Sequence, residues 1–245
     1  MPLKQSEAIV LRSYPLREAD LLVSFFTRTE GKVRGVARSA KKSRRRFGGA
    51  LEPLTTVRLY WEDREREELA RIDSCDVLAS PLSDAVDYPR AAALAHVAEV
   101  LDEALPERET NDAVFRLSTA VLAQLKRGAI WGALTYFDLW MVRLTGFLPE
   151  MEACMLCGAG LAGGRAFFHP LSEGLLCTQD KGMAAGELSL ESRRIAAQML
   201  RAPVECFAGE DWPRARAADL RRFLVQRLER HIEKRLVTAA MLARV

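Results

Sequence analysis

The chain has 245 residues, 49% of them hydrophobic and 28% charged, which is typical of a globular protein with one large or two small domains. No apolar run approaches the ~20 residues needed to cross a bilayer, and the N-terminus has no secretory signal pattern, so we expect a cytoplasmic protein without membrane contact. The net charge of +3 does not by itself indicate a polyanionic partner.

The first 80 residues are rich in strand patterns and contain no long helical pattern. Strands are predicted over residues 5–14, 20–27, 32–38, 56–61 and 69–78. The charged run from Glu62 to Glu68 is interpreted as a hairpin tip between the last two strands. Five strands in so short a span favour a closed barrel such as an OB-fold.

The stretch from Gly31 to Gly49 contains eight lysines and arginines and no acidic residue. Such a density of positive charge suits a nucleic-acid backbone, although a solvated loop is the simpler alternative. Nearby aromatic side chains that could stack on bases are Phe25, Phe26 and Phe47. The predicted contact residues are Lys32, Arg34 and Arg38 on one strand face, and Lys41, Lys42, Arg44, Arg45 and Arg46 in a flexible fringe.

After residue 80 the apolar residues follow a helical period. Helices are predicted over residues 90–101, from caps at 110–112 to about 127, and over 134–144, 189–200 and 212–237. Residues 151–187 are rich in glycine and contain three cysteines, which indicates a loop-dominated insert. We therefore expect an α+β protein with a barrel domain at 1–80 and a helical domain at 81–245, interrupted by the insert.

The cysteines of the insert have the spacing of a zinc ribbon. The odd total of five cysteines argues against a disulfide framework. Cys154 and Cys157 form a CxxC pair, and Cys177 follows at the distance of a second pair, but its partner position is occupied by Asp180. The fourth ligand of a Zn²⁺ ion could be Asp180, His169 or water, and a degenerate ribbon without metal is the alternative.

Motifs of the common catalytic classes are absent from the sequence, which contains no phosphate-binding loop, nucleophile elbow or HExxH helix. We therefore expect a protein that is not an enzyme. Two rival functions are an RNA-binding barrel and a metal-dependent nuclease that uses Asp180 or the run from Glu62 to Glu68. Several helical arginines accompany apolar residues and suit either an acidic peptide with a hydrophobic end or plain solvation; they are Arg127, Arg143, Arg221, Arg222 and Arg227.

Several motifs occur in an order that is similar to that of one known family. Near the N-terminus they are residues 17–20, 26–28, 31–32, 36–38 and 48–53. Farther on, Leu144–Pro149 (LTGFLP) is followed by Cys154–Gly158 (CMLCG) and then by Gly174–Cys177 (GLLC). Along nearly its whole length the chain resembles the RecO family of bacterial recombination mediators.

The resemblance implies an N-terminal OB-fold and a helical domain interrupted by a zinc-ribbon-like element. It also implies a non-enzymatic protein of the RecF pathway that binds single- and double-stranded DNA and anneals complementary strands. Its implied partners are RecR, the acidic C-terminal tail of the single-strand-binding protein (SSB) and, indirectly, RecA. Lys32, Arg34 and Arg38 match the basic strand of the family, whereas Asp180 departs from its four-cysteine pattern.

Overall fold

The computed structural model describes residues 2–63, 67–182, 186–208 and 212–245. Contacts between Cα atoms divide the chain into two compact units, residues 1–126 with 241–245, and residues 127–240. Residues 64–66 of the predicted hairpin tip and 183–185 of the predicted insert lie outside the described residues. Within the described residues, no helix has the length and apolar character needed to cross a bilayer.

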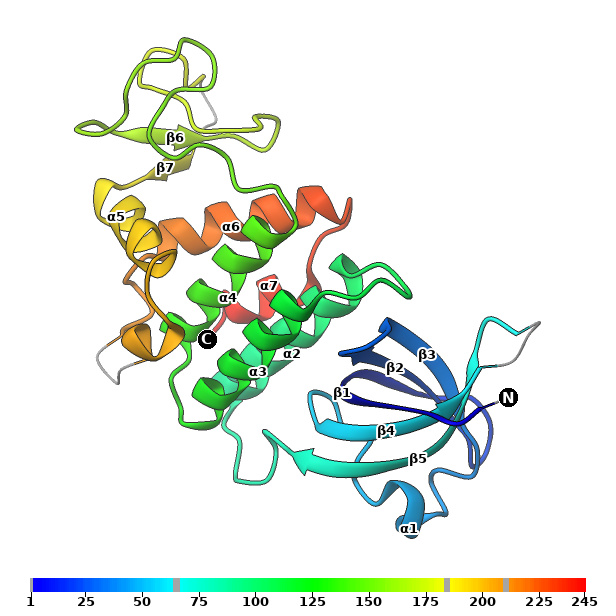
Figure 1. Ribbon diagram of the computed structural model, residues 1–245. Coiled ribbons are helices and arrows are strands. Elements are labelled where there is room, and N and C mark those ends of the chain that lie inside the picture. Colours follow the sequence, from blue (N-terminus) through cyan, green and yellow to red (C-terminus); the bar gives the residue numbers. More distant parts are fainter. Residues whose placement is uncertain (1, 64–66, 183–185, 209–211) are drawn as a thin grey trace. The chain divides into compact units, whose positions relative to one another are not determined.

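The first unit contains a closed five-stranded barrel (Figure 1). Its strands are β1 (Lys4–Pro15), β2 (Leu21–Thr27), β3 (Gly31–Ala37), β4 (Thr56–Glu62) and β5 (Ala70–Ala79). The barrel closes in the order β1-β2-β3-β5-β4, with β4 pairing back onto β1, and β3–β5 is its parallel pair. The five predicted strands and the OB-type barrel are therefore confirmed.

Alternating apolar side chains fill the barrel. Phe25, Val33 and Trp61 are fully buried in this core because every second residue of a strand points inward. Gly35 allows β3 and β5 to approach closely, since a Cβ atom there would lie 2.5 Å from Cδ1 of Ile72 and 2.7 Å from the carbonyl oxygen of Ala70.

The aromatic residues proposed to stack on bases are not available on the surface. Phe25 lies in the barrel core and is fully buried. Phe26, on the opposite face of β2, is also fully buried and packs against Phe115 with 5.5 Å between ring centroids. Phe47 is only 3% exposed. The stacking hypothesis for these three residues is therefore wrong, because each ring is used in packing.

Two helices of the first unit follow the barrel, α2 (Tyr88–Ala104) and α3 (Asp112–Lys126). The side chain of Asp87 accepts a hydrogen bond from the amide of Arg90, and Pro89 lies in the first turn, so α2 begins close to the predicted residue. Helix α2 packs on β1 and β2. Since α2 and α3 share a compact unit with the barrel, the domain boundary at residue 80 stays a prediction.

The second unit is built from α4 (Trp131–Leu144), α5 (Leu190–Met199) and α6 (Ala218–His231), with a 3₁₀ turn over Val204–Phe207. The insert contributes a short hairpin of β6 (Ala166–Phe168) and β7 (Gly186–Leu188) (Figure 1). The single helix predicted over 212–237 is wrong, because α6 ends at His231 and α7 (Val237–Leu242) follows separately. Left-handed backbone at Ala217 and Glu233 interrupts the helical path on both sides of α6.

Candidate nucleic-acid and metal sites

The predicted basic strand face is partly occupied by other residues of the same unit. The ammonium group of Lys32 donates a hydrogen bond of 2.7 Å to the carbonyl oxygen of Asp102 near the end of α2. The guanidinium group of Arg34 forms an ion pair of 2.7 Å with Glu107. Both side chains must therefore break a contact within the protein before they can bind a phosphate group.

Acidic residues near the end of α2 and at the start of α3 also bind cations on β1 and in the turn after β2. Arg12 of β1 forms an ion pair of 2.7 Å with Asp102, and Arg28 forms one of 3.0 Å with Asp112. These contacts attach the end of α2 and the start of α3 to the barrel. The basic residues on this side consequently contribute less free positive charge than the sequence indicates, and the DNA-binding role of Lys32 and Arg34 stays a prediction.

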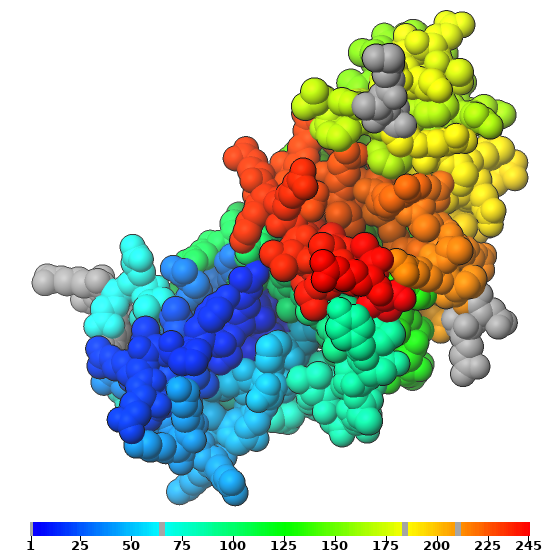
Figure 2. All heavy atoms as spheres, turned by 180° about the vertical axis from the view of Figure 1, so that it is seen from behind, coloured from blue at the N-terminus to red at the C-terminus, as the bar shows by residue number. Residues whose placement is uncertain are grey.

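The loop after β3 carries a dense group of exposed positive charges. We define the basic loop as residues 38–46, which contain six lysines and arginines and no acidic residue. Arg38, Lys41, Lys42, Arg44 and Arg45 are exposed, and the 3.8 Å pair of Lys42 with Glu18 joins two largely exposed side chains. Such a pair contributes little, so these cations remain available to a polyanion. Figure 2 shows all heavy atoms from behind, with the residues of the barrel in blue to cyan.

Part of the stretch that we predicted to be a flexible fringe is helical, and its flexibility stays a prediction. A short helix, α1 (Arg44–Phe47), closes the loop, and its Phe47 is buried in the barrel core cluster. The guanidinium group of Arg46 donates to the Ser43 hydroxyl at 3.2 Å and to the Arg38 carbonyl oxygen at 2.8 Å. It also lies 5.0 Å above the Phe47 ring. The buried phenyl ring gives the end of the loop a defined position.

The acidic run from Glu62 to Glu68 does not have the arrangement of a metal-dependent nuclease site in its described part. The carboxylate of Asp63 forms ion pairs of 2.7 Å with both Lys4 and Arg108. Burial favours a higher pKa for Asp63, but these two cations outweigh it and lower the pKa. Asp63 is thus a stabilising contact between the ends of β1 and β4 and the residues after α2.

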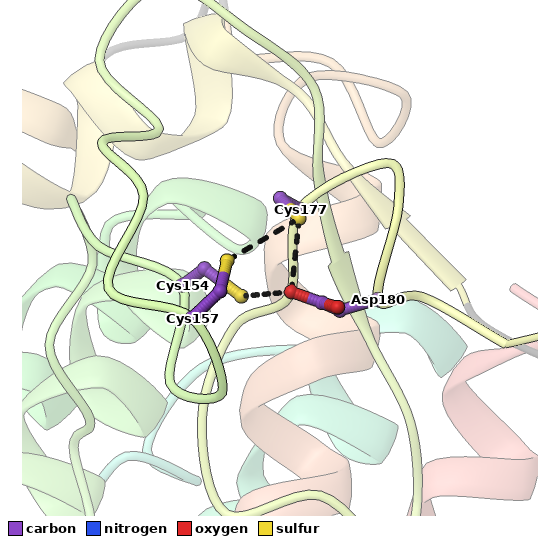
Figure 3. A group of neighbouring side chains, drawn as sticks. All are labelled: Cys154, Cys157, Cys177 and Asp180. Carbon is purple, nitrogen blue, oxygen red and sulfur yellow. Dashed lines mark hydrogen bonds between the residues drawn. The ribbon is translucent and has the colours of Figure 1, made fainter.

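The insert brings the four predicted metal ligands together (Figure 3). The thiols of Cys154, Cys157 and Cys177 and one carboxylate oxygen of Asp180 all lie within 4.8 Å of one another. The Sγ atoms of Cys157 and Cys177 are 3.8 Å apart, and Oδ2 of Asp180 lies 3.2 Å from Sγ of both Cys154 and Cys177. His169 is not a member of this cluster; its Nδ1 accepts a hydrogen bond from the amide of Leu171.

The distance between Cys157 and Cys177 matches that in a tetrahedral zinc site, and the two sulfur–oxygen distances of 3.2 Å are slightly shorter than in such a site. Zn–S bonds of about 2.3 Å place two sulfur ligands about 3.8 Å apart, and a Zn–O bond of about 2.0 Å places sulfur and oxygen about 3.5 Å apart. The cluster is held together by the Asp180 carboxylate, which raises the pKa of Cys157 to about 12 by accepting a hydrogen bond. The thiols in turn lower the pKa of Asp180. The donor set could therefore hold a metal ion, with Asp180 in place of a fourth cysteine.

Buried arginines of the helices support the insert. Arg193 of α5 donates hydrogen bonds of 2.7 and 2.6 Å to the carbonyl oxygens of Leu161 and Gly164, and Arg227 of α6 donates one of 2.9 Å to Ser172. Arg221 is half-buried beside Trp131, and desolvation lowers its pKa to about 10. Arg221 and Arg227 therefore have structural roles, and the plain solvation that we considered for the helical arginines is wrong for these two residues.

A groove of about 460 Å³ in the second unit combines apolar walls with exposed guanidinium groups. Leu139, Leu148 and Leu200 contribute to the apolar walls. Arg143, Arg194 and Arg201 also line the groove, and the last two were not identified from the sequence. Arg194 lies on α5 and Arg201 follows the end of this helix, and only the packing of α5 against α4 shows that they share one groove.

Comparisons with known proteins agree with this architecture. The family described as "Recombination protein O N terminal" matches residues 1–81, and "Recombination protein O C terminal" matches residues 85–239. The chain is 71% identical to the DNA repair protein RecO of Koribacter versatilis, over 98% of both chains. It is 32% identical to the DNA repair protein RecO of Anaeromyxobacter sp. strain Fw109-5, over 97% of this chain and 94% of that protein. Matches that span both units at these identities place the chain in the RecO family of DNA repair and recombination proteins.

Proposed function

We propose that the protein binds single- and double-stranded DNA and anneals complementary strands as a recombination mediator. The observation that carries this proposal is the exposed basic loop, which is free of acidic residues and attached to an OB-type barrel. Its cations bind phosphate groups irrespective of sequence, because the attraction is electrostatic. When two strands bind at once, neutralisation of their phosphates lowers their mutual repulsion and allows the bases to pair.

Charge reversal in the basic loop tests the proposal. The variant Lys41→Glu, Arg44→Glu, Arg45→Glu is expected to lose annealing of complementary oligonucleotides and most of its DNA affinity. The matched control, Arg116→Glu, Arg165→Glu, Arg222→Glu, changes the net charge equally at exposed positions outside the loop and should anneal like the parent chain. Equal loss in both variants would contradict the assignment to the basic loop. A clear preference for RNA over DNA of the same sequence would instead favour an RNA-binding barrel.

We further propose that the groove of the second unit binds the C-terminal tail of SSB. An acidic tail with a hydrophobic end suits apolar walls surrounded by Arg143, Arg194 and Arg201. Capture of SSB should therefore depend on its tail, and Arg194→Glu with Arg201→Glu should abolish it without changing annealing of naked DNA. Capture of SSB lacking its tail would contradict this part of the proposal.

The mediator role extends to RecR and RecA and requires no catalysis by this chain. With RecR present, the protein is expected to accelerate assembly of RecA on SSB-coated single strands, measured as the lag before ATP hydrolysis by RecA. The proposal that the protein is not a nuclease is tested by incubating labelled DNA with the protein and Mg²⁺ or Mn²⁺. Cleavage that increases in proportion to purified protein would overturn it.

A further inference from the structure

A hollow on the outer wall of the barrel lies beside the start of the basic loop. Its cavity volume is about 260 Å³, and it is formed by the turn after β1, by β3 and by the first residues of β5. The parallel pairing of Val36 with Arg71 joins β3 and β5 at its base. Leu16, Val36 and Leu69 provide aliphatic lining. The volume is below the 300–1,000 Å³ typical of sites for drug-sized ligands, so the hollow suits one flat ring system.

Three guanidinium groups surround this aliphatic lining. Arg71 reaches Glu62 only at 3.7 Å, and both side chains are substantially exposed. Among the described residues, the side chains of Arg17 and Arg38 form no hydrogen bond or ion pair. Guanidinium planes stack on nucleobases and also bind phosphate oxygens, so they can satisfy both parts of a nucleotide.

Two carboxylates limit how much negative charge the hollow can accept. Asp20 accepts a hydrogen bond of 2.8 Å from the amide of Ser39, which fixes the entry to the basic loop. Glu67 also lines the hollow. Their charges oppose a continuous run of phosphates along the surface, but they leave the three arginines able to bind one phosphate and one uncharged base.

We propose that this hollow receives one unpaired nucleotide of a single DNA strand. The base lies on Val36 and is flanked by guanidinium groups, while its phosphate binds Arg38. This inference rests on the proposed DNA binding and adds a binding mode for bases. Duplex DNA cannot use the hollow, because its bases are stacked and paired. The hollow therefore favours single strands and keeps one base unstacked next to the basic loop.

Filling the hollow without changing the charge tests the proposal. Val36→Trp places an indole ring on the aliphatic lining, and Val77→Trp is the matched control at a position that is 50% exposed on β5 and does not line the hollow. In a single strand containing 2-aminopurine, the parent chain and Val77→Trp should increase the fluorescence as the base unstacks. Val36→Trp should abolish this increase and weaken single-strand binding about ten-fold, the range for one stacked base, with duplex affinity unchanged.

A second pair of variants keeps the test decisive if Val36→Trp fails to fold. Arg38→Gln should abolish the fluorescence increase, whereas Arg45→Gln, with the same loss of charge, should only weaken binding of both DNA forms. A fluorescence increase that persists in Arg38→Gln, or in a folded Val36→Trp, would overturn the inference while leaving DNA binding intact. Failure of the parent chain to bind DNA would instead contradict the proposed function itself.

Discussion

Asp180 replaces a cysteine in an otherwise complete thiolate cluster, and its carboxylate oxygen occupies the position of the missing sulfur. A carboxylate is a harder ligand than a thiolate, so the site should hold zinc but discriminate less strongly in favour of soft metals than a four-cysteine site. We therefore expect Asp180 to set the metal preference of the insert.

We predict that Asp180→Ala lowers the zinc content of the purified protein from one equivalent towards zero, because one of four ligands is lost. Asp180→Cys should retain zinc and increase the affinity for Cd²⁺ relative to Zn²⁺. Native mass spectrometry and competition between the two metals measure both effects. Asp73→Ala, which removes a carboxylate outside the cluster, is the control. A parent chain that binds no zinc would show that the ribbon is degenerate.

Asp219 stabilises the start of α5 through its carboxylate. One oxygen accepts a hydrogen bond of 2.7 Å from the amide of Ser189, and the other accepts one of 2.5 Å from the Ser192 hydroxyl. Burial favours a higher pKa for Asp219, but these hydrogen bonds outweigh it and lower the pKa. The charged carboxylate is therefore favoured in the folded state.

The lowered pKa determines the direction of the pH dependence. The contribution of Asp219 is fully present above its unfolded pKa of about 3.9 and is lost as the pH falls through the lower folded value. Asp219→Asn should reduce the free energy of unfolding by about 1.5–3 kcal/mol at pH 7, and the difference should decrease below about pH 4. Urea unfolding at both pH values measures it, with Glu191→Gln as an exposed control in the same helical turn. An equal deficit at acidic pH would contradict the role of the charge.

At the scale of elements, helix α5 fixes the insert through a single buried side chain. Arg193 binds backbone carbonyl groups on the loop that follows the CxxC pair, including those of Leu161 and Gly164. The insert has few strand residues of its own, since β6 and β7 each have three residues. Its position therefore depends on this contact and on those from α6.

We predict that Arg193→Met releases the insert from α5, because three carbonyl groups lose their donor at a cost of about 1–3 kcal/mol. Limited proteolysis should then cut within residues 151–164 at least several times faster than in the parent chain. Arg194→Met, one residue farther along the helix but exposed, should leave the cleavage rate unchanged. Equal rates for the two variants would exclude Arg193 as the anchor.

At the scale of the whole molecule, the distribution of charge matters more than its sum. The net charge is only +3, and Asp102 in the last turn of α2 and Glu107 after this helix neutralise cations on β1 and β3. The basic loop, in contrast, groups five exposed cations on the barrel, and the ion pair of Lys42 with Glu18 is long and exposed. DNA affinity should consequently depend on salt mainly through this loop.

Removing two of these cations should change the salt dependence by a defined amount. For Arg44→Gln with Arg45→Gln, the slope of log affinity against log salt should fall by about 1.8 for duplex DNA and about 1.4 for single strands, from two lost phosphate contacts. Fluorescence anisotropy at several salt concentrations measures the slope. Arg116→Gln with Arg222→Gln, exposed on other helices, should leave it unchanged. An unchanged slope in the loop variant would place the phosphate contacts elsewhere.

The sequence by itself determined the five strands, the basic loop and the three clustered cysteines, because each depends on local patterns such as alternation or the spacing of cysteines, whereas the structure selected Asp180 over His169 as the fourth member of the cluster. Only the tertiary structure decided which of the basic residues are exposed. Asp102 and Glu107 are about 70 residues from Lys32 and Arg34, and no local pattern relates such distant residues. The burial of Phe25, Phe26 and Phe47 and the hollow beside Arg38 likewise arise from closure of the barrel and packing of α3, which join segments far apart in the chain.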